Sequence, residues 1–309
     1  MRNKFKNCFH ATRTVQIEWL LMLVLIFCVA FISATTAKAR KSSVSEGKSH
    51  HATLDGSRIH YKSYGKGREA IVLIHGWTCN LDFWRDQIPD LSKRNRVVAI
   101  DLPGHGQSDK PQIPYSMDLF ARAVDAVMRD AQVERAVLVG HSMGTPIARQ
   151  FYRKYPQKTL AIVNVDGPFS PFDKNLIGGL LAGVRGPNYK EVGRQTFAAM
   201  AGPNASPELK ERIVAAFINP PQHVVVSAME GMADESIWGP DKINVPVLAI
   251  MARGPFWAAD TEQIFRSIAP NLDFQMWDGV GHFLMMEKPK QFNNAVLAFL
   301  DKNSLLKKN

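Results

Sequence analysis

One serine in the sequence stands in a context that would make it a nucleophile. Ser142 is the centre of the sequence Gly-His-Ser-Met-Gly at positions 140–144, which follows the apolar run 136–139. A serine hydroxyl attacks a carbonyl carbon only when a neighbouring base removes its proton. Glycines on both sides permit a tight turn from a strand into a helix, and this turn exposes the serine to such a base. The pattern therefore predicts a serine nucleophile that forms an acyl-enzyme.

The base that this serine needs is predicted at His282. This histidine follows the apolar stretch 272–277 and lies at the end of a glycine-rich loop at 278–281. Glycines would let the loop carry an imidazole over the ends of the strands, toward Ser142. A histidine can accept the serine proton near neutral pH and return it to the leaving group.

These side chains need a scaffold, and the alternation of segments predicts one. Amphipathic stretches separate short apolar runs that suit strands buried on both faces of a parallel sheet. The sequence therefore predicts an α/β fold, with a mostly parallel sheet between helices and a hairpin at its antiparallel edge. The strand-like runs are 71–74, 96–100, 136–139, 160–165, 245–250 and 272–277, the helix-like stretches are 81–91, 117–130, 146–155 and 260–268, and the hairpin is 52–64.

Four motifs carry a resemblance to a known family. They are His-Gly-Trp at 75–77, Asp-Leu-Pro-Gly-His-Gly-Gln-Ser-Asp at 101–109, the serine motif at 140–144 and Gly-Val-Gly-His at 279–282. Their order and spacing resemble those of the α/β-hydrolase family over residues 52–302. The resemblance implies a core with an eight-stranded, mostly parallel sheet, an inserted helical cap and a Ser–His–acid triad in that chain order.

The resemblance leaves the acid of the triad open. In most family members this carboxylate follows the seventh strand, where the present sequence has Arg-Gly-Pro-Phe-Trp at 253–257. Asp166, at the end of the sixth predicted strand, is the first candidate, because some members carry their acid there. Asp260 is the second candidate, if its loop folds back. Either carboxylate could hold the second ring nitrogen of His282 and stabilise the imidazolium.

Acyl transfer also needs hydrogen-bond donors that stabilise the negative charge developing on the carbonyl oxygen. The resemblance implies that these are the backbone N–H groups of Trp77 and Met143. Signatures of a metal or cofactor site, such as His-Glu-x-x-His, a cysteine pair or a dinucleotide fingerprint, do not occur in the sequence. We therefore expect a reaction without a metal or a cofactor.

The strand–helix rhythm breaks at 168–240. Glycine and proline pairs separate short helix-like pieces there, which predicts a helical cap inserted into a core made of 52–167 and 241–309. Aromatic and methionine side chains in and around this segment favour an apolar pocket for an acyl chain or ring. They are Phe169, Phe172, Phe197, Met200, Met229, Met232, Trp238, Phe256, Trp257 and Phe283.

The amino-terminal segment differs in composition from this core. Four basic residues precede an unbroken apolar run at 19–32, and Ala-Lys-Ala follows at 37–39. Such a sequence is typical of a secretory signal peptide, here 1–39. The run is shorter than the roughly 20 residues of a spanning helix, and a membrane anchor at 19–32 is the alternative. We expect an exported protein, periplasmic or extracellular, with 40–51 as a flexible polar spacer.

The predicted function is that of a secreted serine hydrolase that cleaves a carboxylic ester or related acyl bond of a small molecule. A thioesterase, a lactonase, a carbon–carbon bond hydrolase and a non-catalytic ligand-binding protein on the same scaffold are the alternatives. Dehalogenases and epoxide hydrolases are disfavoured, because they carry an aspartate where Ser142 stands. The net charge of +10 comes from scattered basic residues, so we expect no nucleic-acid partner. Membrane contact is expected only if the leader stays uncleaved.

Overall fold

The computed structural model describes residues 47–217 and 220–306. The predicted signal peptide at 1–39, with the alternative anchor at 19–32, and most of the predicted spacer lie outside these residues. Within the described ranges, no helix combines the length and the hydrophobicity that crossing a membrane requires.

Strands and helices alternate along the described chain. The strands are β1 (Lys48–Leu54), β2 (Ser57–Tyr64), β3 (Glu69–Ile74), β4 (Val97–Ile100), β5 (Arg135–His141), β6 (Thr159–Val165), β7 (Val247–Ala252) and β8 (Leu272–Trp277). The α-helices are α2 (Ile88–Leu91), α3 (Met117–Asp130), α4 (Gly144–Lys154), α5 (Lys174–Arg185), α6 (Tyr189–Met200), α7 (Pro207–Phe217), α8 (Gln222–Ala233), α9 (Thr261–Ile268), α10 (Leu284–Glu287) and α11 (Pro289–Lys302). Short 3-10 helices are η1 (Leu81–Trp84), η2 (Pro156–Lys158) and η3 (Glu235–Trp238).

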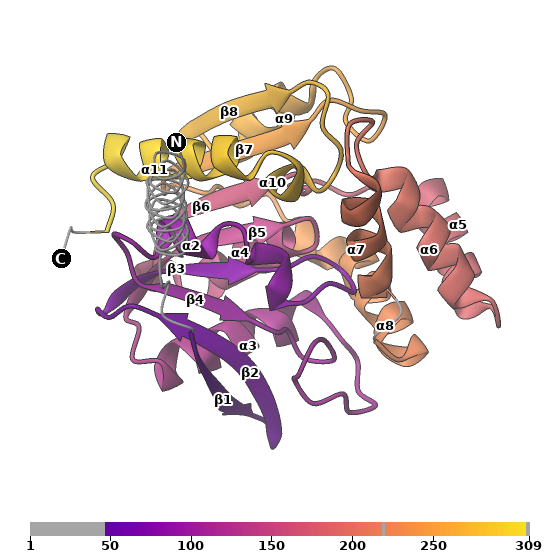
Figure 1. The fold of residues 1–309 in the computed structure, drawn as a ribbon, viewed down its shortest axis with the longest axis horizontal. Helices are drawn as coiled ribbons and strands as arrows, with labels where there is room; N and C mark the ends of the chain where they lie inside the picture. Colours follow the sequence, from indigo (N-terminus) through magenta and orange to yellow (C-terminus); the bar gives the residue numbers. More distant parts are fainter. Residues whose placement is uncertain (1–46, 218–219, 307–309) are drawn as a thin grey trace, which may run out of the picture. The chain divides into compact units, whose positions relative to one another are not determined.

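All the strands join one eight-stranded sheet in the order β1-β2-β4-β3-β5-β6-β7-β8. Strands β3 to β8 are mutually parallel, and only β1 and β2 run antiparallel to their neighbours. The inner strands are mostly apolar, as expected where helices cover both faces of the sheet (Figure 1). This arrangement confirms the predicted α/β class and its eight-stranded, mostly parallel sheet.

Two segments differ from the prediction. Residues 48–51 of the predicted spacer belong to β1, because their backbone pairs with β2 and the His50 ring stacks on Tyr61 at 5.2 Å. A polar edge strand needs only backbone pairing, which the sequence pattern does not reveal. The predicted helix at 81–91 is divided into η1 and α2, because Pro89 lacks an amide hydrogen and fits only the first turn of a helix.

The segment predicted as a cap contains α5 to α8 and η3, between β6 and β7. Figure 1 shows these four α-helices at the end of the molecule to which the arrowheads of the central strands point. Arg149 of α4 fixes both ends of the segment to the core. Its guanidinium is 2% exposed and donates to the carbonyl oxygens of Phe169 at 2.7 Å and Gly239 at 2.6 Å. The cap is therefore tied to the helix that follows Ser142.

Candidate active site

Ser142 lies in the turn between β5 and α4, at the carboxyl edge of the sheet. Its φ angle of 53° is in the left-handed region, which non-glycine residues rarely adopt. A Cβ atom at Gly140 would overlap the carbonyl oxygen of Gly144, and one at Gly144 would overlap that of Ile74. The glycines are therefore required by close backbone approach, and the turn presents the serine side chain at the strand ends.

His282 is held by Asp166, at the carboxyl end of β6. Nδ1 of the ring is 2.7 Å from Oδ2 of this carboxylate, which is 1% exposed. Because an ionised carboxylate only accepts hydrogen bonds, Nδ1 carries the proton and Nε2 of the neutral ring keeps a free lone pair. The other oxygen, Oδ1, accepts from the amide of Ala252 and from Nε1 of Trp257, both at 2.8 Å. Three N–H groups thus fix the plane of the carboxylate.

The second candidate acid lies elsewhere. Asp260 stands at the start of α9, where it is exposed and makes no side-chain capping bond. The loop that precedes it brings Trp257 to Asp166 instead. The structure therefore brings Asp166, and not Asp260, to the ring of His282.

Trp257 takes part in this site, and sequence reasoning assigned it only to a pocket wall. It lies on the loop after β7, the place where most relatives carry their acid. Its indole N–H points at the carboxylate of Asp166, 91 positions earlier in the chain. The only signal in the sequence was the missing carboxylate at 253–257, which indicates that the loop has a different task.

The main chain of His282 is fixed from two further directions. Its amide donates to the carbonyl oxygen of Met200, at the end of α6, at 2.9 Å. Its own carbonyl oxygen lies 2.9 Å from Nε2 of His141, which donates to it. Burial lowers the pKa of His141 well below its ordinary value, and this ring therefore stays neutral.

Ser142 and His282 line one cavity of about 520 Å³, together with Asp166 and Trp77. In the described part of the chain, no hydrogen bond joins the Ser142 hydroxyl to another residue, and its side chain faces the cavity. Catalytic contacts of this kind are commonly long without substrate and shorten when substrate binds. The cavity therefore brings the predicted nucleophile, base and acid together.

The two predicted oxyanion donors lie beside the serine. Met143 is the N-cap of α4, whose amino end carries positive partial charge, and no described residue accepts a hydrogen bond from its amide. The backbone before Trp77 passes close to the serine, since a Cβ atom at Gly76 would lie 3.1 Å from that of Ser142. The indole of Trp77 donates to the carbonyl oxygen of Val225 in α8 at 2.9 Å and ties this loop to the cap.

Two buried histidines support the loop that carries Trp77. Nε2 of His75 accepts from the amide of Leu102 at 3.1 Å, and Nε2 of His105 accepts from the amide of Thr78 at 3.3 Å. Each ring can accept only while that nitrogen is unprotonated. Burial lowers the pKa of both rings, that of His105 to about 3. The loop is therefore held by neutral imidazoles.

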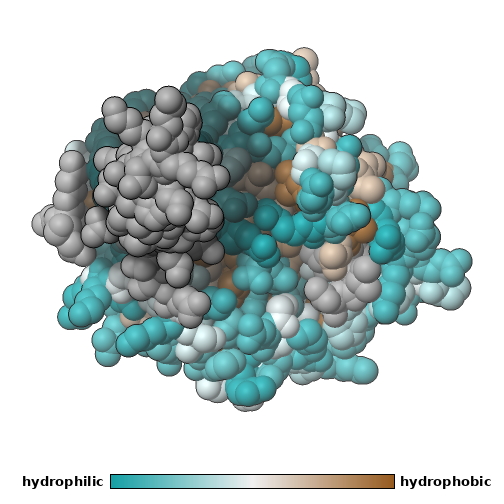
Figure 2. All heavy atoms as spheres, in the orientation of Figure 1, coloured by the Kyte–Doolittle hydropathy of each residue, from teal (hydrophilic) through white to brown (hydrophobic). Residues whose placement is uncertain are grey.

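The wall of the cavity away from the catalytic edge is apolar. Among the described residues that line it, there is no lysine, arginine or glutamate. Leu176 and Phe256, at 49% and 41% exposure, mark where it opens. Figure 2 shows hydrophobic surface on the side where Figure 1 places the cap helices. Of the predicted pocket residues, Phe172, Phe197, Met200, Met229, Met232, Phe256, Trp257 and Phe283 line the cavity, whereas Phe169 and Trp238 do not.

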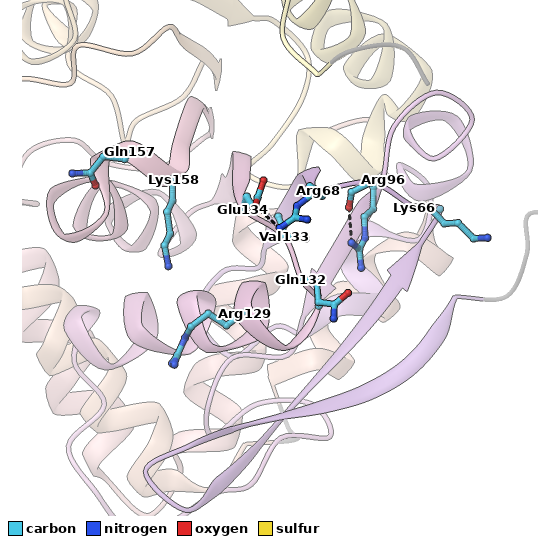
Figure 3. Close-up of a pocket in the computed structure, with 12 residues that line it drawn as sticks. Lys66, Arg68, Arg96, Arg129, Gln132, Val133, Glu134, Gln157 and Lys158 are labelled. Atoms are coloured by element: carbon cyan, nitrogen blue, oxygen red, sulfur yellow. Dashed lines mark hydrogen bonds and ion pairs between the residues drawn. The ribbon is translucent and has the colours of Figure 1, made fainter.

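A larger hollow, of about 1010 Å³, lies at the opposite edge of the sheet. It is lined by polar residues at the amino ends of the strands, among them Arg68, Arg96, Glu134 and Lys158 (Figure 3). Glu134, the one carboxylate among the described residues of its wall, is paired with Arg68 at 2.5 Å. None of the predicted site residues lines it, so the chemistry predicted from Ser142 belongs to the smaller cavity.

Comparison with known proteins agrees with this description. The family model of the alpha/beta hydrolase fold matches residues 69–219. An uncharacterized protein of Mycobacterium tuberculosis is 36% identical over 125 residues, which are 40% of this chain and 36% of that protein. A pimeloyl-[acyl-carrier protein] methyl ester esterase of Edwardsiella ictaluri is 35% identical over 109 residues, or 35% of this chain and 40% of the esterase. The chain thus spans well under half the length of these two relatives.

A solved structure described as Est816, an N-acyl homoserine lactone degrading enzyme, superposes with a TM-score of 0.71 at 27% identity. The superposition covers 81% of this chain and 100% of that one. A mostly parallel eight-stranded sheet with a serine at a sharp turn between strand and helix defines the class of protein. The chain has the α/β-hydrolase fold.

The neutral histidines predict a dependence of stability on pH. The pKa of His105 is about 3 in the folded protein and 6.5 ordinarily, so the unfolded chain binds one more proton between these values. This histidine therefore contributes stability above its unfolded pKa that is lost as the pH falls, by about 1.4 kcal/mol per pH unit. In the variant His105→Gln, the amide can still accept from Thr78 and donate to Pro103, without titrating.

Urea unfolding of both proteins at pH 6 and pH 5 measures the effect. Between pH 6 and pH 5, the unfolding free energy of the unmodified protein should fall by about 1.2 kcal/mol more than that of the variant. A difference in unfolding free energy that stays constant with pH would show that His105 is not held neutral.

Proposed function

We propose that this protein is a serine hydrolase that cleaves a carboxylic ester or a related acyl bond of a small apolar molecule. The observation that carries the proposal is the 2.7 Å contact between His282 and Asp166 in a cavity that Ser142 also lines. A base whose second nitrogen is held by a buried carboxylate is the arrangement that serine nucleophiles use on several unrelated folds.

The reaction begins when the hydroxyl oxygen of Ser142 attacks the carbonyl carbon of the ester, while Nε2 of His282 takes the hydroxyl proton. The amides of Met143 and Trp77 stabilise the negative oxygen of the tetrahedral intermediate. The proton on Nε2 then passes to the leaving alcohol, and an acyl-enzyme remains on the serine. His282 next removes a proton from water, whose oxygen attacks the acyl carbon. The bond to Ser142 then breaks, the proton passes from His282 to the serine oxygen, and the acid is released. Asp166 stabilises the imidazolium in both steps. No step requires a metal or a cofactor.

The relatives support an ester rather than an amide as the substrate. One is named as a methyl ester esterase and another as a lactone-degrading enzyme. A lactone is an internal ester, so attack by the same serine would open its ring without any change of mechanism. N-acyl lactones therefore belong in the substrate panel beside open-chain esters.

Replacing Ser142 by alanine tests the proposal directly. We expect the unmodified protein to hydrolyse p-nitrophenyl esters and to bind a fluorophosphonate covalently at Ser142, as located by mass spectrometry of the labelled peptide. Ser142→Ala should take no label, and its kcat/KM should be lower by about 10³-fold or more. An unmodified protein that folds but takes no label and cleaves no ester or lactone would instead be a non-catalytic binding protein.

The acid is tested by a matched pair of variants. In Asp166→Asn the side-chain amide can present its NH2 group to His282, which favours the wrong tautomer of the ring, so kcat should fall about 10³- to 10⁴-fold. The same change at Asp260, which is exposed and does not contact the ring, should leave kcat within about twofold. Steady-state kinetics with one ester decide between the two candidate acids. A large loss of kcat in Asp260→Asn with little change in Asp166→Asn would assign the role of the triad acid to Asp260.

We also propose that the protein is exported and that the leader at 1–39 is removed. The support is the order of basic residues, apolar run and Ala-Lys-Ala in the sequence. Expression with the full leader and intact-mass analysis of the exported protein should give a chain that begins at Arg40. Recovery of the uncut chain in the membrane fraction would favour the anchor at 19–32 instead.

A further inference from the structure

One segment of the cap is joined to the loop that carries His282. This segment follows α6, and the loop, here called the histidine loop, comprises residues 278–282. The amide of His282 donates to the carbonyl oxygen of Met200 at 2.9 Å, and Nδ2 of Asn204 donates to the carbonyl oxygen of Gly279 at 3.2 Å. A Cβ atom on Gly281 would overlap the backbone nitrogen of Gly202. The two backbones therefore touch, with glycine on both sides of the contact.

One carboxylate bridges the two segments. Glu287, the last residue of α10, accepts the amide hydrogen of Gly202 at 3.0 Å and that of Gly281 at 3.1 Å. In the described part of the chain, no lysine or arginine forms an ion pair with this side chain. Its charge is therefore directed at backbone N–H groups. Hydrogen bonds from N–H groups to a charged carboxylate are stronger than hydrogen bonds between neutral groups.

The same cap helix forms part of the cavity wall. Val192, Thr196, Phe197 and Met200 of α6 line the cavity. The ring of Phe197 packs at 5.7 Å on that of Phe283, the residue after His282. A group that fills this part of the cavity presses on α6, and α6 is fixed to the histidine loop by the contacts above. Filling of the apolar wall and placement of the imidazole are thus mechanically linked.

We propose that Glu287 is a positioning residue that couples the acyl-binding wall of the cap to His282. The preferred substrates are then uncharged esters whose acyl chain is long enough to reach α6, because only these order the histidine loop through the bridge. The described part of the cavity wall contains no lysine or arginine, which agrees with an uncharged acyl group. This inference rests on the proposed function, since it requires that Ser142 be acylated.

The test compares kcat for p-nitrophenyl acetate and hexanoate in the unmodified protein and in Glu287→Gln. A glutamine keeps the size of the side chain and can still accept from both amides through Oε1, but it removes the negative charge and places an NH2 group where Oε2 accepted from Gly281. We expect kcat to be higher for hexanoate than for acetate in the unmodified protein. In the variant this ratio should fall about fivefold or more, because the charged bridge between the histidine loop and the segment after α6 is lost and only the contacts from Met200 and Asn204 remain. KM for hexanoate should stay within about twofold, since the apolar wall is unchanged.

A matched control lies in the same groove between cap and core. Glu208 lines this groove together with Glu287 but does not bond to the histidine loop, so Glu208→Gln removes the same charge and should leave the ratio unchanged. If Glu287→Gln fails to fold, Asn204→Ala removes the other side-chain contact to the loop and should lower the ratio in the same direction. A ratio that is unchanged in the folded variants, or kcat for both esters falling equally, would overturn the coupling.

Fluorophosphonate labelling separates the two proposals. If Ser142 is labelled to completion in Glu287→Gln but the ratio of kcat values does not change, only the coupling fails. If the unmodified protein itself takes no label, the serine hydrolase mechanism fails, and the coupling fails with it.

Discussion

The hydrogen bond between His282 and Asp166 is the interaction on which the rest of the site depends. It orients the imidazole ring of His282. The main chain of the same residue is held by Met200 of the cap on one side and by His141, next to the serine, on the other. The imidazole is therefore fixed by the core, by the nucleophile strand and by the cap at once. Removing any one of these loosens the placement of the ring, and proton transfer needs placement to within a fraction of an ångström.

The parallel sheet makes this placement possible. Ser142 and Asp166 each follow a buried strand, β5 and β6, and these strands are neighbours with their carboxyl ends side by side. Both residues have positive φ angles, 53° and 47°, which cost of order 1–3 kcal/mol each. Such strain persists only where the flanking structure is rigid, and two strands that are buried over most of their length provide that rigidity. Turning sharply at the strand end is what lifts both side chains out of the sheet and toward the histidine.

The sequence predicted the parts of the site that are carried by local pattern and left open the parts that depend on long-range folding. Ser142 lies in a turn that needs glycine at fixed offsets, and His282 follows a strand on a glycine-rich loop, so both could be located from neighbouring residues. Asp166 and Asp260 could not be separated, because the path of the loop after β7 is decided by packing rather than by its own composition. For the same reason the strand pairing of 48–51 was missed. Polar residues at a sheet edge are held by backbone hydrogen bonds that leave no periodic signal.

The absence of a carboxylate after β7 has a physical reason under the proposal that Asp166, on β6, is the acid. The loop at 253–257 runs beside Asp166, close enough for Trp257 to donate to its Oδ1 at 2.8 Å. A second carboxylate at that place would face the first across a buried site, and two like charges so close favour protonation of one of them. A protonated Asp166 would no longer stabilise the imidazolium of His282. An indole N–H supplies the opposite partial charge, keeps the carboxylate in plane and closes the cavity with an apolar ring. With Asp166 on β6 as the proposed acid, Trp257 of the β7 loop supplies a hydrogen-bond donor where a carboxylate would supply a like charge.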